Sequence, residues 1–384
     1  DGKEIAHGAR KRCSMEESKF SIIFSDLTDP RVDRTKRHKL LDIIGLTICA
    51  VLCGADNWVE VAEFGEAREE WLKTFLELPN GIPSHDTLGR VFSMIDGAEF
   101  ERCFAEWVRQ LAGLTSKVIA IDGKAIRGSR ENARAITVVS AWAAANQLVL
   151  GQQAVEGKSN EITAIPELIE MLDVKGKIVT IDAMGTQVAI AEQILAKGGD
   201  YLLAVKANQG QLRDEMEFIF QIDRQQNFKD APYDYAETVN KGHGRIETRR
   251  CWIVSDEEYL HDFANKWPGL KGLVFIESER IINEKIDRSM RYFITSLNSN
   301  AAQILEYQRS HWGIENKLHW VLDIAFNEDR ARMRKDNAAS NFSIIRKMSL
   351  NLLRQDKTSK TGVKGKRLRC GWDDKYLFNI LNQA

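Results

Sequence analysis

The spacing of apolar positions changes twice along the chain. From residue 20 to about 114, apolar residues recur every three to four positions, most clearly between Leu40 and Leu52. This period is typical of helices that pack one face into a core. The stretch from Pro83 to Phe92 begins like a capped helix, with Ser84 or Asp86 at the N-cap. The pattern therefore predicts an N-terminal domain of short helices.

From residue 117 the pattern becomes one of short runs rich in β-branched residues. Three such runs, separated by turn-forming residues, predict a meander of hairpins. A helix, a strand, a second helix and a second strand follow, and two glycines, Gly198 and Gly199, end the second helix. The predicted elements are strands 118–121, 136–143 and 148–155, helix 160–172, strand 177–182, helix 187–197 and strand 201–205. Their order predicts an α/β fold with a ribonuclease-H-like mixed sheet flanked by helices.

The remainder of the chain divides the predicted core into two parts. Strand-like segments return at 245–254, 272–282 and 291–297, with a hairpin loop at 283–287, and a helical pattern follows around residues 311–323. We expect six regions. They are 1–19, disordered or foreign to the natural chain; 20–114, helical; 115–221, first part of the core; 222–297, a β-rich insertion; 298–355, second part of the core; and 356–384, a basic C-terminal tail.

Three acidic residues stand at positions suited to chemistry. Asp122 and Asp182 each end an apolar strand, and a carboxylate at a buried strand end is costly unless a cation pairs with it. Glu315 lies on the predicted helix, on one polar stripe with His311, His319 and Asp323 at four-residue spacing. The opposite stripe is apolar and is expected to be buried: Ile314, Leu318, Val321, Leu322 and Ala325.

Three carboxylates on separate elements favour a divalent-metal centre for phosphoryl transfer. Oxygen-rich ligation suits magnesium or manganese better than zinc. Two other interpretations remain open. Each aspartate, taken singly, could be satisfied by a neighbouring cation such as Lys124, Arg127 or Arg130. The paired His311 and His319 could instead belong to a zinc hydrolase, although the HExxH arrangement is absent.

Composition changes this interpretation in two respects. The formal net charge is only −1, yet thirteen Lys or Arg against two acids lie between Arg330 and Arg369. Such a basic tract is typical of a polyanion partner, and the alternative is a solvated helix face followed by a flexible tail. The six cysteines form no CxxC pair, which favours a reduced intracellular protein. The longest apolar run, residues 43–55, is too short to cross a bilayer, so no membrane partner is expected.

Several longer segments resemble a known family. IDGKAIRGS (121–129), KSNEITAIPELIEMLDVKGKIVTIDAMGTQ (158–187), GGDYLLAVKANQG (198–210), HGRIETR (243–249) and HWGIENKLHWVLD (311–323) are similar to the H-repeat-associated branch of the insertion-sequence DDE transposases. The resemblance covers about residues 20–353. It implies a bacterial DNA transposase with a ribonuclease-H-like core, in which Asp122, Asp182 and Glu315 form the catalytic, metal-binding triad.

The chain departs from the wider superfamily around Glu315. The tyrosine, arginine and lysine that accompany the catalytic glutamate there correspond to Gln308, His311 and Leu322 here. We therefore expect His311, Lys317 and His319 to take over part of the contact with DNA phosphates. The complete set of residues expected to contact DNA is Lys124, Arg127, Lys206, Asn208, Gln209, His243, Arg245, Arg249, His311, Lys317, His319, Arg332 and Arg334.

The resemblance further implies two Mg²⁺ ions, with Mn²⁺ as a substitute, and DNA partners in the form of terminal inverted repeats and a target. It also implies a homodimer in a synaptic complex and a bacterial, cytoplasmic, nucleoid-associated location. The expected activity is metal-dependent DNA cleavage followed by strand transfer. The N-terminal helices are equally compatible with a DNA-binding module and with a packing domain. Two alternatives remain: a catalytically silent or domesticated DNA-binding protein, and a metal-dependent nuclease that performs no strand transfer.

Overall fold

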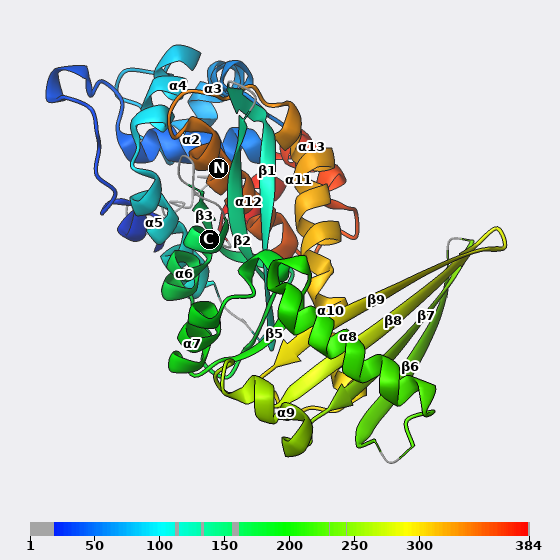
Figure 1. Ribbon diagram of the computed structural model, residues 1–384. Coiled ribbons are helices and arrows are strands. Elements are labelled where there is room, and N and C mark those ends of the chain that lie inside the picture. The colour runs from blue at the N-terminus through cyan, green and yellow to red at the C-terminus, as the bar shows by residue number, and fades with distance from the viewer. Residues whose placement is uncertain are drawn as a thin grey trace, which may run out of the picture. The chain divides into compact units, whose positions relative to one another are not determined.

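The computed structural model describes residues 19–111, 115–131, 134–155, 161–229, 231–242 and 244–382 (Figure 1). Apart from Lys19, the expected terminal region 1–19 lies outside these residues. Contacts between residues divide the chain into two compact units. The helical unit comprises residues 1–111, 127–134 and 322–384, and the sheet unit comprises residues 112–126 and 135–321. Residues beyond 322 thus group with the N-terminal helices, although the sequence pattern assigned 298–355 to the core.

The described residues form one sheet of nine strands, most of which lies in the sheet unit. They are β1 (Val118–Glu131), β2 (Arg134–Ala143), β3 (Leu148–Ala154), β4 (Ile178–Ile181), β5 (Asp200–Val205), β6 (Tyr233–Gly242), β7 (Arg245–Val254), β8 (Gly272–Ile282) and β9 (Lys285–Thr295). Their spatial order is β3-β2-β1-β4-β5-β9-β8-β7-β6. Strand β4 runs parallel to both β1 and β5, while β2 and β3 pair antiparallel. The first five strands have the predicted ribonuclease-H-like order, which confirms the fold class.

The predicted insertion continues the same sheet. Strand β9 pairs antiparallel with β5, and β8, β7 and β6 follow antiparallel in turn. Two expectations here were wrong. Strand β6 was not predicted, and β9 begins at Lys285 because the hairpin turn consists only of Asn283 and Glu284, both with positive φ. The outer halves of these strands are largely exposed, so they lack the apolar alternation that marks a half-buried strand.

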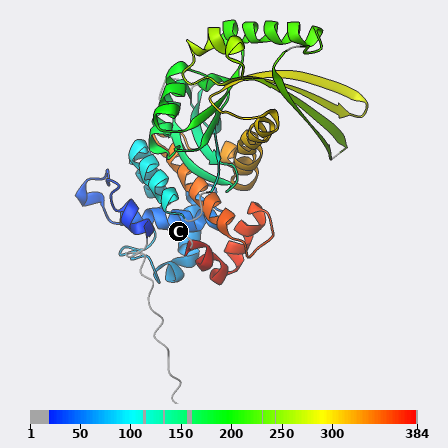
Figure 2. The same ribbon diagram turned by 90° about the horizontal axis from the view of Figure 1, so that it is seen from below.

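Helices cover the two faces of the sheet differently (Figures 1 and 2). Four helices share one apolar core with the sheet, and α10 packs in a second core on the opposite face, where it meets Cys251 and Ile276. Gly198, with a φ of +74°, follows α7 and ends it as expected. The four helices of the first core are α6 (Glu161–Met171), α7 (Val188–Ala196), α8 (Gly210–Gln225) and α9 (Glu257–Ala264), and α10 spans Ala301–His311.

The helical unit surrounds one buried helix, α12 (Ala338–Gln355), whose residues 338–353 are all buried. Ser84, one of the two expected N-caps, accepts a hydrogen bond from the Thr87 amide at the start of α4. The other helices are α1 (Lys19–Phe24), α2 (Leu40–Leu52), α3 (Trp58–Leu72), α4 (His85–Met94), α5 (Gly97–Gln110), α11 (Trp320–Phe326), α13 (Val363–Trp372) and α14 (Asp374–Leu381). Among the described residues, no helix has both the length and the hydropathy to cross a membrane.

Part of the basic tract lies inside this unit rather than on its surface. Four of the cations, Arg346, Lys347, Lys366 and Arg367, are at most 8% exposed. Lys366 donates to the carbonyl of Leu353 at 2.9 Å, and Arg367 donates to that of Val51 at 2.8 Å. These carbonyls belong to the last turns of α12 and α2, which lack partners within their own helices. The two cations therefore cap helix ends, and the expected basic tail contains the folded helices α13 and α14.

Candidate active site

The two aspartates lie at the same level of the sheet. Ile121 of β1 is in register with Ile181 of the parallel strand β4. The next residue in each case is an aspartate, so Asp122 and Asp182 stand side by side where the pairing of β1 with β4 ends. Asp182 follows the end of β4 as expected, but β1 continues to Glu131, so the expectation that Asp122 ends its strand was wrong.

The turn after β4 holds Asp182 through its backbone and its neighbours. The Met184 amide donates to Oδ1 of Asp182 at 2.8 Å, and the Lys206 ammonium lies 3.7 Å from Oδ2. The side-chain amides of Asn208 and Gln209 donate to the carbonyls of Ala183 and Thr186. Asn208 and Gln209 therefore position the Asp182 turn, and a DNA contact by either of them stays a prediction.

Glu315 reaches the aspartates from a distorted helix. Helix α10 ends at His311, and a π-helical turn spans Glu315–His319, so the regular α-helical stripe expected across this region was wrong. Single π-helical turns occur frequently at functional sites. Most of the apolar side was predicted correctly, since Ile314, Leu318 and Leu322 are fully buried and Ala325 is buried, but Val321 is only half-buried.

The three carboxylates share one small cavity. Its volume is about 190 Å³, and Asp122, Asp182 and Glu315 all line it. The basic or aromatic side chains in its wall are Lys206, Arg291, Phe293, His311 and Trp312. The guanidinium of Arg291 stacks over the Trp312 ring at 4.7 Å from its centroid. Acidic groups and a few cations thus surround the same space.

Electrostatics couple these acids. Burial, together with the charges of Asp182, Glu315 and Glu161, raises the pKa of Asp122 to about 7, although a hydrogen bond from the Gly123 amide opposes the shift. Nδ1 of His319 lies 3.5 Å from Oδ2 of Asp122. A carboxylate crowded by other acids in this way is the kind of group that a divalent cation stabilises.

The residues fit a divalent cation through the chemistry of their donors. Among the described residues, no three His, Cys, Asp or Glu side chains already stand close enough together to enclose a metal ion. Magnesium does not require such a cage, because it keeps several waters and binds through one or two carboxylates together with substrate phosphates. Carboxylate oxygens facing one cavity satisfy that requirement, and Asp122, Asp182 and Glu315 are the residues that would hold the metal.

His311 has a different environment from the one expected of a phosphate-binding cation. Its Nδ1 lies 2.9 Å from Oγ1 of Thr180. Burial lowers the pKa of His311 to about 4, so the imidazole is neutral near pH 7. His311 can therefore contribute a hydrogen bond to the cavity, and a charge-based contact with phosphate is not available to it at that pH.

The other expected DNA contacts are distributed over both units. Arg127 pairs with Asp329, its Nε lying 3.4 Å from Oδ2. Arg245 is exposed at the start of β7, Arg249 lies 2.8 Å from Glu247, and Lys317 is exposed on the π-helical turn. Lys124 is half-buried on β1, and His243 lies outside the described residues. None of these positions is tested as a DNA contact, and each stays a prediction.

Arg332 and Arg334 line a separate cleft that belongs entirely to the helical unit. Its volume is about 790 Å³. Both arginines are exposed, while the alternating residues Ala331 and Met333 are buried. The remaining basic side chains of its wall are His85, Arg90, Arg330 and Lys335. Nothing in the order of residues indicated that residues from α4 would lie beside the segment after α11.

Two residues of the sheet-unit site were missed from the sequence. Arg291 lies within strand β9, and the pattern carried no sign that this strand passes the cavity. Glu161 opens α6 and contributes to the raised pKa of Asp122. Its position within the segment KSNEITAIP could have drawn attention, because it is an acid at the start of the helix that follows the β3 strand.

Comparison with known proteins identifies the family. A family model described as "DDE_Tnp_1-associated" matches residues 22–108, and one described as "Transposase DDE domain" matches residues 113–352. The chain is 43% identical over 375 residues to "H repeat-associated putative transposase YhhI" of Escherichia coli strain K12, covering 96% of this chain and 98% of that protein. It is 45% identical over 366 residues to "Putative transposase YncI" of Escherichia coli O157:H7, covering 93% of each.

A solved structure of the piggyBac transposase synaptic complex with hairpin DNA aligns with a TM-score of 0.47 at 12% identity, covering 94% of this chain and 80% of that one. The sequence matches extend through both aspartates and Glu315. The chain therefore belongs to the DDE-domain transposases, and its relatives include an H-repeat-associated protein.

Proposed function

We propose that this protein binds the terminal inverted repeats of a bacterial insertion sequence, cleaves DNA there with the help of divalent cations, and joins the freed 3′ end to target DNA. The observation that carries the proposal is the convergence of Asp122, Asp182 and Glu315 on one cavity. Membership of the transposase family supplies the reaction class.

The roles of the acids follow from their positions. Asp122 and Asp182 directly follow the last paired residues of β1 and β4, so both can contact the same ions, and Glu315 completes one ion from the π-helical turn. Divalent cations supply activation of the attacking oxygen and stabilisation of the leaving oxygen. We propose Mg²⁺ as the natural ion, with Mn²⁺ as a substitute. Lys206 beside Asp182 is suited to contact a phosphate at the cavity mouth.

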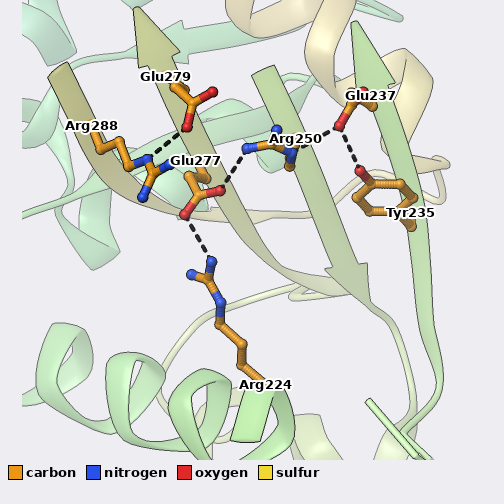
Figure 3. Close-up of polar contacts among 7 residues, drawn as sticks. All are labelled: Arg224, Tyr235, Glu237, Arg250, Glu277, Glu279 and Arg288. Carbon is orange, nitrogen blue, oxygen red and sulfur yellow. Dashed lines mark hydrogen bonds and ion pairs between the residues drawn. The ribbon is translucent and has the colours of Figure 1, made fainter. Parts of the chain in front are cut away.

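The two faces of the insertion strands differ in how their charges are satisfied. On the α8 side, arginines and glutamates pair in a ladder: Arg250 bonds Glu237 and Glu277, Arg224 bonds Glu277, and Arg288 bonds Glu279 (Figure 3). These pairs leave little uncompensated charge, so this side has a structural role.

The α10 side carries the arginines expected to meet DNA. Side chains alternate along a strand, and Cys251 of β7 packs in the core with α10, so Arg249 and Arg245 point to the same side as Cys251. By the strand register, Arg280, Lys285 and Arg291 share this side with three acids, Glu247, Asp287 and Asp234. Arg291 also lines the catalytic cavity. This excess of cations supports a path for the DNA backbone that leads to the triad.

The cleft of the helical unit supports a second DNA contact. Its exposed Arg332 and Arg334, with Arg330 and Lys335, offer positive charge beside the apolar ring of Trp58. Terminal-repeat recognition needs more contacts than a catalytic cavity of about 190 Å³ can supply. We propose that this cleft holds phosphates of the repeat, and that two protein copies act together on paired ends.

The decisive experiment uses DNA that carries the inverted repeats bordering the coding region. Purified protein with Mg²⁺ is expected to cleave at the repeat ends and to attach a labelled end to a second DNA. Asp122→Asn, Asp182→Asn and Glu315→Gln should each reduce both products to background while binding of the repeat DNA persists. Glu70→Gln, at a side chain that is 91% exposed, is the matched control and should behave as wild type.

Three outcomes separate the alternatives. Cleavage without attachment to a second DNA would identify a nuclease. Repeat binding that needs no divalent ion, with no cleavage under any condition, would identify a catalytically silent DNA-binding protein. Cleavage that persists in all three triad variants would remove the proposed site.

A further inference from the structure

The backbone of β1 is approached very closely by an acid from another element. Gly123, the residue after Asp122, faces the carboxylate of Glu161. A Cβ built on Gly123 would come within 2.9 Å of Oε2 and nearer still to Oε1. Only a residue without a side chain leaves room for this approach. The missing side chain of Gly123 therefore leaves a space against β1, which the Glu161 carboxylate occupies.

Glu161 reaches β1 from the face opposite to the Glu315 segment. Ile119 and Ile121 pack in the core that contains α6, whereas Val118 packs in the core that contains α10. Because side chains alternate, Gly123 belongs to the α6 side and Asp122 to the other. Glu161 and Glu315 therefore approach β1 from opposite sides, near the level where its pairing with β4 ends.

The Glu161 carboxylate is half-buried at the start of α6. Within the described part of the chain, no ion pair or side-chain hydrogen bond to Glu161 is present. Burial and the charge of Asp182 raise the pKa of Glu161. An acid held in this way beside two other carboxylates is costly unless it meets a cation.

We propose that Glu161 is a fourth carboxylate of the catalytic centre, which holds the second divalent ion together with Asp182 while Glu315 serves the first. This inference rests on the proposed function. If Glu315 completes one ion, the other has only the two aspartates, and Glu161 is the described acid that lies against β1 beside Asp122. Two carboxylates per ion are enough for a cation that keeps several waters.

A purely structural role is the competing explanation. An acid in the first turn of a helix is stabilised by the helix dipole, which is worth a few tenths to about 1 kcal/mol. Glu161→Gln would then lower the stability of the fold without changing how many ions the protein binds. The test must therefore count ions and not only measure activity.

The experiment titrates Mn²⁺ into the purified full-length protein and measures bound and free ion by electron paramagnetic resonance. Wild type is expected to bind two ions. Glu161→Gln is expected to bind one, or to bind the second at least tenfold more weakly, and Glu161→Asp should restore part of that affinity. Gly123→Ala should reproduce the loss, because its methyl group would displace the carboxylate. Glu167→Gln on the same helix is the control.

Two results would overturn the inference: equal ion number and affinity in wild type and Glu161→Gln, or a wild type that binds a single ion. Asp122→Asn separates this failure from failure of the proposed function. If Asp122→Asn loses Mn²⁺ binding and Glu161→Gln keeps it, only the fourth carboxylate is refuted. If Asp122→Asn also binds like wild type, the metal centre itself is refuted. Thermal unfolding without Mn²⁺ verifies that each variant is folded.

Discussion

The imidazole Nδ1 of His319 lies 3.5 Å from Oδ2 of Asp122, and both side chains are less than 20% exposed. One residue lies on the π-helical turn and the other on β1, so the contact ties the Glu315 segment to the first catalytic strand. A partner of this kind fixes the orientation of a metal-binding carboxylate.

Removal of this partner should weaken metal binding without abolishing it. We expect His319→Ala to lower the affinity for Mn²⁺ by roughly 10- to 100-fold, as is typical for residues that orient metal ligands. Isothermal titration calorimetry measures the change. His261→Ala, at a side chain that is 78% exposed, should leave the affinity unchanged. An unaltered affinity in His319→Ala would show that Asp122 is oriented by other contacts.

The two faces of the insertion strands should respond differently to loss of arginine. Arg245→Ala with Arg249→Ala is expected to weaken DNA binding and to reduce the slope of log affinity against log salt by about 2, one for each phosphate contact. Arg250→Ala with Arg288→Ala, which breaks the ladder in Figure 3, should lower the free energy of unfolding and leave the salt slope near its wild-type value. Equal slopes for the two pairs would contradict a DNA path along the α10 side.

The cleft of the helical unit gives a third prediction. Arg332→Ala with Arg334→Ala should weaken binding to repeat DNA with a similar loss of salt slope, because these exposed cations line the cleft. Lys360→Ala with Lys364→Ala removes two exposed cations of the same basic tract that do not line it. Fluorescence anisotropy at several salt concentrations compares the pairs. A larger loss in the lysine pair would place the contact elsewhere on the tract.

Stability should depend on a buried network around Asp356. Its carboxylate accepts hydrogen bonds from Tyr376 Oη at 2.6 Å and from Thr358, and Lys366 Nζ lies 3.3 Å away. Burial by itself raises the pKa of Asp356, but the hydrogen bonds from Thr358 and Tyr376 and the charge of Lys366 outweigh it and hold the pKa below its ordinary value. Asp356→Asn breaks a buried pair and should cost about 3–5 kcal/mol in the free energy of unfolding.

The same network predicts the response to acid. A carboxyl whose pKa is lower in the folded state contributes stability above its unfolded pKa and loses it as the pH falls toward the folded value. The free energy of unfolding of the wild type should therefore fall as the pH drops below 3.8, the ordinary pKa of an aspartate. In Asp356→Asn, the free energy of unfolding should decrease less over the same pH range. Denaturant titrations between neutral and acidic pH measure it. Asp262→Asn, at a side chain that is 92% exposed, should keep the wild-type profile.

Much of the fold was predictable because the core strands and helices are strongly patterned. The aliphatic strands before Asp122 and Asp182 were identified from residue type, and their register brings the two acids together as expected. Strand β6 and the outer half of β9 were not identified from the sequence, because exposed strands carry polar residues on both sides. The π-helical turn was also missed, because it follows from packing and not from the four-residue spacing of His311, Glu315 and His319.

The sequence by itself determined which acids were candidates for the site, because an aspartate that directly follows a run of aliphatic strand residues is costly without a cation and is therefore visible in residue order alone. It also determined the number of cations after Arg330. Only the tertiary structure decided where those cations act. Arg367 and Lys366 are buried in the helical unit, where they donate hydrogen bonds to carbonyls at helix ends. Arg332 and Arg334 instead face solvent. The contact between Glu161 and Gly123 likewise depends on the tertiary structure, because these two residues are far apart in the chain and meet only when α6 packs on the sheet.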